Sequence, residues 1–376
     1  MKNHFYLPLL AIVALSTFSS CKKSKTEPEP EPETPVTPVY TVPTTYNFAN
    51  ADFSSSTRQI EMLGELTTYL RSAHTTTAAT QPTLSAQKLK DMYANVNNPF
   101  ASNTLNTSGI NLKTKTGNAL SFQSLMEANF DDAQPASISA AANPTTSTAS
   151  NGVRGKLVSP ARAILVDANG FEYKEYAEKG LMGAVFYYQA TTLLSTISSL
   201  DNTQIVNGRT AQEKAWDEAF GYFGVPVAFP TSTVGLRNWG SYCNSVNVAI
   251  NSNSTIMNAF LKGRAAISNK DNAGRDAAAT TVINTWEKVA AAKCISYLKG
   301  AKNNLSDKAT LHHNLSEGYG FVVSFQYNPS KTINATDIAT LLGYFGTNLH
   351  NLSTSNLDLA ISKLETVFSL NAAIIP

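Results

Sequence analysis

Apolar residues recur every three or four positions along most of the chain, which is the spacing of a buried helix face. In residues 58–72, for example, Ile60, Leu63 and Leu70 fall on one stripe. The same spacing predicts further helices over residues 83–95, 121–130, 174–200, 211–223, 254–267, 275–298, 306–327, 335–344 and 355–368. The pattern therefore predicts an all-α body.

Two stretches depart from this spacing. Residues 101–155 are dominated by Asn, Ser, Thr, Ala and Gly and, apart from the helix at 121–130, are predicted to be a long loop system. Residues 163–173 are predicted to form a small hairpin, because a short apolar run precedes the turn pair Asn169-Gly170. The predicted fold class is all-α, with long polar loops and at most this one hairpin.

One predicted helix carries a signal for its position in the fold. The middle of helix 174–200, from Leu181 to Tyr188, is apolar on every face. A helix that is apolar all round must be covered on all sides. We therefore expect this helix to lie at the centre of a bundle.

The N-terminus has the pattern of an export signal. Lys2 precedes an apolar run that is too short to remain as a membrane-spanning helix, and two serines precede Cys21. This arrangement resembles the lipobox of bacterial lipoproteins, in which the cysteine becomes the lipidated first residue, although Phe18 stands where Leu is usual. We expect residues 1–20 to be a signal peptide and Cys21 the lipid anchor; the alternative is an ordinary cleaved secretory signal.

Residues 21–45 are predicted to be an extended tether. Glu-Pro repeats fill residues 27–33, and proline removes the backbone donor and disfavours helix in the residue before it. At ~3.1 Å per residue such a segment could span roughly 70 Å. The folded body is then residues 46–376, which we expect as one helical domain or as two bundle halves, 46–205 and 206–376.

Composition limits the function classes. Only 15% of the residues are charged, and the formal net charge is +2, so the chain lacks the concentrated positive charge that nucleic acid binding needs. Three cysteines in 376 residues exclude a disulfide framework. Cys243 and Cys294 either form one disulfide or remain two free thiols.

His313 and Glu317 are the first candidate site. They are one turn apart on the predicted helix 306–327, so their side chains can share a metal ion or a proton. Gly320 and Ser324 follow on the same face and leave room for a cleft. The alternative is a solvated helix face with an ordinary i,i+4 pair.

Asp217 and Glu218 are candidates to complete that metal site. They are adjacent and diverge by ~100° on a helix, so one of them is expected to join His313 and Glu317. Carboxylate and imidazole ligands suit iron, zinc or calcium. The alternative is that one of the acids pairs with Arg264.

Four residues are candidates for contacts with an organic ligand. Trp216, Tyr222 and Arg264 accompany the acidic pair, and Trp239 lies in a loop flanked by glycines, where an aromatic ring can line a pocket. Core packing is the alternative for Trp239.

Five segments together resemble a known family. They are Tyr46-Asn-Phe with Arg58-Gln-Ile-Glu-Met-Leu, Asn169-Gly-Phe-Glu-Tyr with Glu178-Lys-Gly-Leu-Met-Gly-Ala, Trp216-Asp-Glu-Ala-Phe-Gly-Tyr-Phe-Gly, Gly263-Arg-Ala-Ala-Ile, and His312-His-Asn-Leu-Ser-Glu-Gly-Tyr-Gly-Phe. In this order they resemble uncharacterised lipoproteins from Bacteroidota that are related to the imelysin-like proteins.

The resemblance covers residues 46–376 and carries expectations of its own. It implies an exported, anchored, all-α body made of two helical-bundle halves. It also implies an association with iron regulation and iron uptake. One branch of the imelysin-like proteins is described as peptidases. The imelysin-like signature Gly-x-His-x-x-Glu is absent from this chain, and His313 with Glu317 is the nearest pattern.

Together these observations predict a lipid-anchored protein of the cell envelope that binds a metal, an iron complex or a small ligand. Its expected partners are the membrane, through Cys21, and envelope transport or receptor proteins, with no nucleic acid. The alternatives are a metal-dependent peptidase of the imelysin type and a structural or partner-binding lipoprotein.

Overall fold

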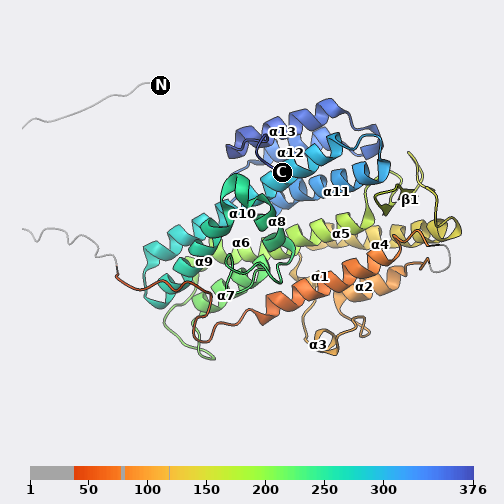
Figure 1. Ribbon diagram of the computed structural model, residues 1–376. Coiled ribbons are helices and arrows are strands. Elements are labelled where there is room, and N and C mark those ends of the chain that lie inside the picture. Colours follow the sequence, from red (N-terminus) through yellow and green to blue (C-terminus); the bar gives the residue numbers. More distant parts are fainter. Residues whose placement is uncertain (1–37, 78–80, 118) are drawn as a thin grey trace, which may run out of the picture. The chain divides into compact units, whose positions relative to one another are not determined.

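Helices make up most of the described chain in the computed structural model, which describes residues 38–77, 81–117 and 119–376 (Figure 1). The α-helices are α1 (Ser54–Ser72), α2 (Ala86–Ala94), α3 (Asn103–Asn106), α4 (Ala119–Ala142), α5 (Tyr173–Leu181), α6 (Tyr188–Ser195), α7 (Ala211–Phe223), α8 (Asn238–Ile250), α9 (Ser252–Ser268), α10 (Asn272–Lys302), α11 (Lys308–Ser324), α12 (Ala335–Phe345) and α13 (Thr354–Phe368). A π-helical segment, η3 (Met182–Tyr187), joins α5 to α6. Short 3-10 helices are η2 (Lys113–Lys115), η4 (Ile197–Ser199), η5 (Phe325–Tyr327) and η6 (Leu349–Asn351). The predicted all-α fold class is confirmed.

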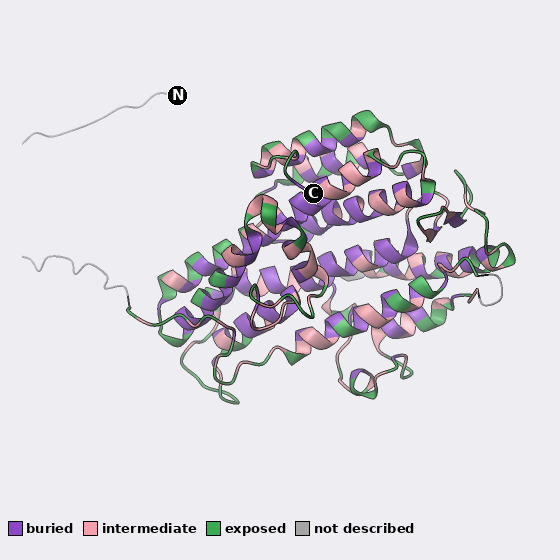
Figure 2. Ribbon diagram, viewed as in Figure 1, coloured by how far each residue is buried: buried purple, intermediate pink, exposed green. Residues whose placement is uncertain are grey.

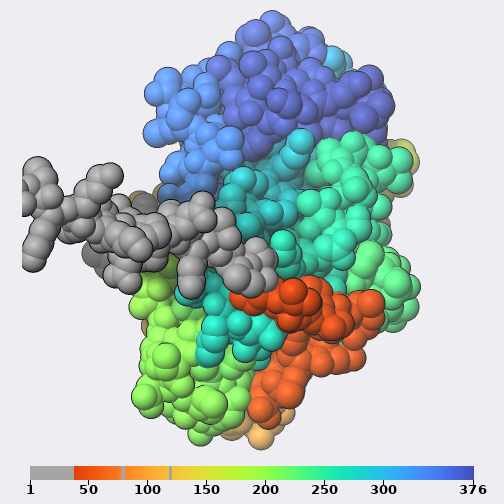
Figure 3. All heavy atoms as spheres, turned by 90° about the vertical axis from the view of Figure 1, so that its left-hand side faces the viewer, coloured from red at the N-terminus to blue at the C-terminus, as the bar shows by residue number. Residues whose placement is uncertain are grey.

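The predicted signal peptide, Cys21 and the first part of the tether lie outside the described residues. The described end of the tether lies against the helical body. Figure 3 shows the first described residues, in red, beside green and cyan segments. The Tyr40 hydroxyl donates to Asp271 over 2.8 Å. Within the described ranges, none of the helices is both long and apolar enough for a membrane span.

The central helix is α5–η3–α6, as its apolar pattern predicts. Every residue from Leu181 to Tyr187 is buried. Helix α5 packs against α11 and α1, while α10 packs against α9, α11 and α13. Figure 2 shows buried residues on the facing sides of these helices. One hydrophobic cluster contains residues of both expected halves. The residues of α5 are themselves mostly buried, so this helix runs through the protein interior.

The hairpin exists but its position differs from the prediction. Strand β1 (Gly155–Val158) pairs antiparallel with β2 (Ala163–Val166), so the turn is at residues 159–162. Strand β2 pairs along its length with the strand before it, and its last residue, Val166, also bridges to Glu172 across the predicted turn. Asn169-Gly170 still makes a tight turn, with Gly170 at φ +86°, and this turn leads the chain into α5.

Three helices differ from the sequence prediction, of which the four-residue α3 lies in the stretch predicted as loop. Helix α4 continues to Ala142 through Pro135, because its face with Met126, Phe130 and Ala140 remains buried and outweighs the proline penalty. Helix α8 was missed altogether. Its sequence is rich in Asn and Ser, and only a few positions of it are buried, so the apolar stripe is too sparse to stand out.

Candidate functional site

Helix α5 brings two Lys–Glu pairs into the interior. Its sequence Lys174-Glu175-Tyr-Ala-Glu178-Lys179 places Lys174 with Glu178, and Glu175 with Lys179, one turn apart. Lys174 Nζ lies 2.6 Å from Glu175 Oε1 and also contacts Glu178. Lys179 Nζ lies 2.8 Å from Glu175 Oε2 and 3.1 Å from Glu178 Oε1. Since the Lys179 and Glu175 side chains are each 1% exposed, these charges must neutralise one another inside the protein.

Helix α11 adds His313 and Glu317 to the same network. His313 Nδ1 lies 2.8 Å from Glu172 Oε2 and 3.5 Å from Glu175 Oε1, and Nε2 lies 3.7 Å from Glu317 Oε1. Glu317 Oε2 lies 3.2 Å from Lys179 Nζ but accepts no hydrogen bond from a described residue. The structure thus brings His313 and Glu317 together as their spacing predicts. Their face packs against α5, so the alternative of a solvated face is wrong.

The small residues of α11 let α5 approach closely, and Gly320 also lines a pocket between α11 and the pair α4–α5, as the prediction of a cleft on this face requires. A Cβ on Gly320 would lie only 2.3 Å from Lys179 Cβ, and one on Gly183 would lie 2.9 Å from Ser324 Cβ. Contacts this close tolerate no side chain at these glycines. Gly320 therefore sets the distance at which Lys179 meets Glu317.

The network shifts the pKa values of its members in opposite directions. Burial and the charge of Glu175 raise the pKa of Glu317 to about 8, against the opposing effect of Lys179. Burial alone would raise the pKa of Glu175, but the neighbouring ammonium groups hold it well below its usual value. Burial would lower the pKa of His313, but its hydrogen bond with Glu172 and the nearby carboxylates raise it. Protons in the network are therefore expected on His313 and Glu317, and not on Glu175.

Three side chains of this network can act together as metal ligands. One atom each of Glu172, Glu175 and His313 can be chosen such that all lie within 4.8 Å of one another. His74, at the end of α1, approaches from the other side, with Nδ1 3.9 Å from Glu172 Oε1. Carboxylate and imidazole donors fit a divalent cation such as iron, zinc or calcium. Chemically, the cluster can hold such a cation or share protons.

Asp217 does not join this site. Its carboxylate is fully buried and accepts hydrogen bonds from Arg264 Nε at 2.9 Å and from the Tyr46 hydroxyl at 3.0 Å. Arg209 lies 3.4 Å away. The predicted metal set with Asp217 is thus replaced by the alternative pairing with Arg264. Glu218 contacts Tyr222, whose hydroxyl lies 3.4 Å from it, and is also absent from the His313 cluster.

The aromatic candidates are core residues. Trp216 is buried and donates from Nε1 to the Phe260 carbonyl oxygen over 3.0 Å. Trp239 donates over 3.0 Å to the carbonyl of Met182, the first residue of the π-helical segment, where the backbone ladder is interrupted. Tyr222 is buried and donates to Gln59 over 3.2 Å. Core packing, the alternative for Trp239, is what the structure shows.

The two cysteines of the body are free thiols. Cys243 and Cys294 are both buried and unpaired. The Cys243 thiol lies 3.4 Å from Asn253 Oδ1, and that of Cys294 lies 3.4 Å from the Gly318 carbonyl oxygen. Burial raises the pKa of Cys243 to about 12, so the thiol is unreactive at neutral pH.

His312 is expected to make the fold sensitive to acid. The residue is 1% exposed, and its Nδ1 lies 2.9 Å from the Gly170 carbonyl oxygen. Its ring also faces His350, at a centroid distance of 4.4 Å, and Lys308 opposes its protonation. Burial lowers the pKa of His312 from 6.5 to about 4, so the unfolded chain binds the proton more readily. The contribution of His312 to stability is therefore complete above about pH 6.5 and is lost as the pH falls toward 4.

Replacing His312 by asparagine should flatten this dependence. The difference in unfolding free energy between about pH 7 and pH 4.5 should shrink by on the order of 2 kcal/mol relative to wild type. Urea titrations of both proteins at both pH values measure it. Other titrating groups are shared by the two proteins and cancel. Equal changes with pH in the two proteins would contradict the assignment.

Sequence reasoning missed the acidic half of the network. Glu175 and Lys179 lie on α5, Glu172 immediately precedes this helix, and His74 follows α1. All four are far from His313 in the sequence. One signal was present. The Lys–Glu pairs open the helix whose next turns are apolar on every face, and charges at the start of such a helix are expected to be buried themselves.

Comparison with known protein families gives a match over most of the chain. Residues 43–341 match the family model described as "Domain of unknown function (DUF4856)". Neither a curated protein nor a solved structure matches the chain. The match covers α1 to α11, including the whole charged network.

Proposed function

The chain belongs to the family of the domain of unknown function DUF4856, and we propose that it is an envelope binding protein that holds one divalent metal ion between α5 and α11. The ligands are Glu172, Glu175 and His313. The observation that carries the proposal is the convergence of these three donors, from α11, from α5 and from the residue that precedes α5, within 4.8 Å of one another.

The charge balance of the network supports a cation. The carboxylates of the network are Glu172, Glu175, Glu178 and Glu317, and the ammonium groups in ion pairs with them are Lys174 and Lys179. Four negative and two positive charges leave an excess of two negative charges. A divalent ion offsets this excess without the protons that His313 and Glu317 otherwise carry. The ammonium group of Lys293, whose Nζ lies 4.6 Å from the centre of the Tyr297 ring, forms no ion pair with a described residue but acts on Glu317 electrostatically and offsets part of this excess.

The enclosure of the donors favours holding a metal over peptide hydrolysis. The side chains of Glu172, Glu175 and His313 are 2%, 1% and 16% exposed. A peptidase needs room for a polypeptide and an open metal position for water. Buried ligands beneath packed helices suit capture or storage, which is the role we propose, in preference to the imelysin-type peptidase.

The proposed location follows from the N-terminus. The residues before Cys21 have the lipoprotein pattern, and the Glu-Pro segment after it provides a spacer between a membrane and the helical body. Incorporation of labelled palmitate into the protein, lost in Cys21→Ser, would support the anchor. An unlabelled, freely secreted mature chain would contradict it. We place iron-uptake or receptor proteins of the envelope among the partners.

Metal analysis tests the site. The full-length protein, stripped with a chelator and then dialysed against iron(II), zinc or calcium separately, should retain one equivalent of at least one of them. Removing a residue that hydrogen-bonds to a metal ligand weakens metal affinity by about 10–100-fold, and removing a ligand itself should weaken it at least as much. We therefore expect Glu172→Gln and His313→Gln each to weaken binding by about 10–100-fold or more.

His350→Gln is the matched control, since this histidine lies outside the cluster. It should bind metal like wild type. Retention of metal by all three variants would assign binding elsewhere. No stoichiometric metal in wild type would leave the network as an internal ion-pair cluster with a purely structural role.

A further inference from the structure

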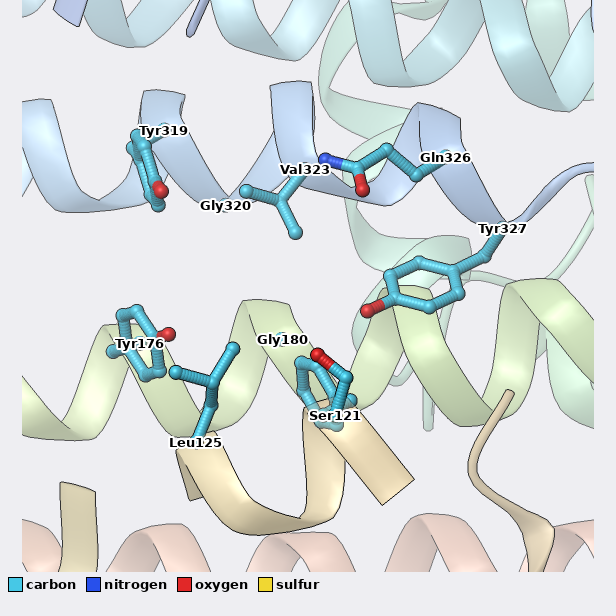
Figure 4. A pocket seen from close by; sticks show the side chains of 10 residues that line it. Ser121, Leu125, Tyr176, Gly180, Tyr319, Gly320, Val323, Gln326 and Tyr327 are labelled. Atoms are coloured by element: carbon cyan, nitrogen blue, oxygen red, sulfur yellow. The ribbon is translucent and has the colours of Figure 1, made fainter. Parts of the chain in front are cut away.

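A pocket lies beside the charged network, between α11 and the pair α4–α5. Its volume is about 140 Å³. In Figure 4 the side chains on α11 project across the pocket toward those on α4 and α5, and Tyr327 closes one end. Gly180 and Gly320 form part of its wall, and Gly320 backs directly onto Lys179. The pocket is therefore separate from the proposed metal ligands but shares a wall with their network.

The lining of this pocket is aromatic and uncharged. Tyr176, Tyr319 and Tyr327 provide ring surface, and Ser121 and Gln326 provide further polar groups. None of the residues lining the pocket is Asp, Glu, Lys or Arg. A charged ligand would have no partner here, so the lining fits a neutral molecule.

The three tyrosine hydroxyls have no hydrogen-bond partner among the described residues. This applies to Tyr176, Tyr319 and Tyr327, although all of them are buried or half-buried. Burial raises the pKa of Tyr176 to about 12, so its hydroxyl stays protonated and can donate. Convergent polar groups without internal partners, set in an apolar wall, are typical of a ligand pocket.

A second hollow extends the pocket along the same groove. It has a volume of about 350 Å³ and shares Leu125, Tyr176 and Tyr319 with the first. Its far end is lined by the amide of Asn169, the hydroxyl of Thr347 and the carboxylates of Asp132 and Asp167, which can accept hydrogen bonds from sugar hydroxyls and disfavour an anionic ligand. The two hollows thus form one cleft with aromatic rings at the junction.

We propose that this cleft binds a neutral saccharide, with one pyranose ring in the pocket and the chain continuing into the second hollow. An apolar cavity of about 150 Å³ accepts benzene, and the hydroxyl groups that make a pyranose larger than benzene would extend from the pocket into the second hollow. A hydrocarbon ring would leave the tyrosine hydroxyls unpaired, whereas a pyranose presents a C–H face to the rings and hydroxyls to the tyrosines. The site goes beyond the proposed metal function and does not depend on it.

Saturation-transfer NMR on the full-length protein, in a detergent without a sugar headgroup, tests the proposal. The probes are glucose, galactose, mannose, N-acetylglucosamine and their neutral oligomers at millimolar concentration. At least one series should bind, and oligomers should bind more tightly than the monomer. Chelator-stripped protein should bind equally well, so failure of the metal proposal leaves this test intact.

Three variants locate the binding. Val323→Phe fills the pocket and should abolish the signal. Tyr327→Phe removes one hydroxyl and should weaken binding about three- to tenfold, the value of one hydrogen bond. Tyr344→Phe, a tyrosine outside the cleft, should bind like wild type. If Val323→Phe fails to fold, Tyr327→Phe still decides.

Three outcomes would overturn the proposal. The first is that no neutral saccharide of the panel binds. The second is that both pocket variants bind as wild type does. The third is that no oligomer of a bound sugar displaces that sugar. Binding of a neutral aromatic probe alone, without any saccharide, would assign the cleft to another ligand class and would also overturn it.

Discussion

Lys179→Met is expected to destabilise the protein by about 3–5 kcal/mol at neutral pH, because removing one partner of a buried ion pair leaves uncompensated charge inside the protein. Lys179 Nζ contacts Glu175, Glu178 and Glu317 within 3.2 Å, and its side chain is 1% exposed. These carboxylates together hold the pKa of Lys179 well above its usual value in spite of burial. Methionine preserves the approximate length of the side chain, so lost packing contributes little.

Urea unfolding of the full-length protein measures this loss. The loss should be smaller at about pH 5 than at pH 7. At the lower pH, protons can neutralise the buried carboxylates that have lost Lys179. Lys302→Met is the control: this lysine pairs with Asp358 at the surface, where an ion pair contributes about 1 kcal/mol or less. Equal losses in the two variants would show that the interior network does not stabilise the fold.

Arg264→Leu is the second large effect, and we expect a loss of about 3–5 kcal/mol. Arg264 is 1% exposed, and it donates from Nε to Asp217 and from one terminal nitrogen to Glu213 over 2.7 Å. Without Arg264, the contacts that remain to the buried Asp217 carboxylate include the hydrogen bond from the Tyr46 hydroxyl and the ion pair with Arg209 at 3.4 Å. Burial already raises the pKa of Asp217, so this carboxylate depends on Arg264 for its charge.

A double-mutant cycle separates charge from packing. Asp217→Asn combined with Arg264→Leu should lose clearly less than the sum of the two single variants, because neither buried charge is then left alone. Thermal and urea unfolding of all four proteins provide the data. Strict additivity would mean that the two side chains act independently and that the cost is one of packing alone.

The candidate site illustrates how far local sequence patterns reach. His313 and Glu317 could be paired from their i,i+4 spacing, because the geometry of one helix is sufficient for that. Glu172 and Glu175 could not be assigned to them, since their approach depends on the docking of α5 on α11. The tightness of that docking depends on Gly320, and no helical periodicity reports a distance between two helices.

Asp217 and Trp216 illustrate the converse. Their residue types suggested ligand contacts, and the structure instead places them in the core beside Arg264 and Phe260. The same side chains serve a metal site or an internal ion pair, depending on which helix they face. Residue type alone does not decide between these roles.

The amino-acid sequence by itself determined the helical class, most helix positions and the central place of residues 181–187, because these follow from local periodicity and from the need to cover apolar faces. The pairing of β2 with β1, the course of α8 and the convergence of α1, α5 and α11 on one buried charged network were decided only by the tertiary structure. Such contacts join residues far apart in the chain, and their free energies depend on distances and burial that exist only once the helices have packed.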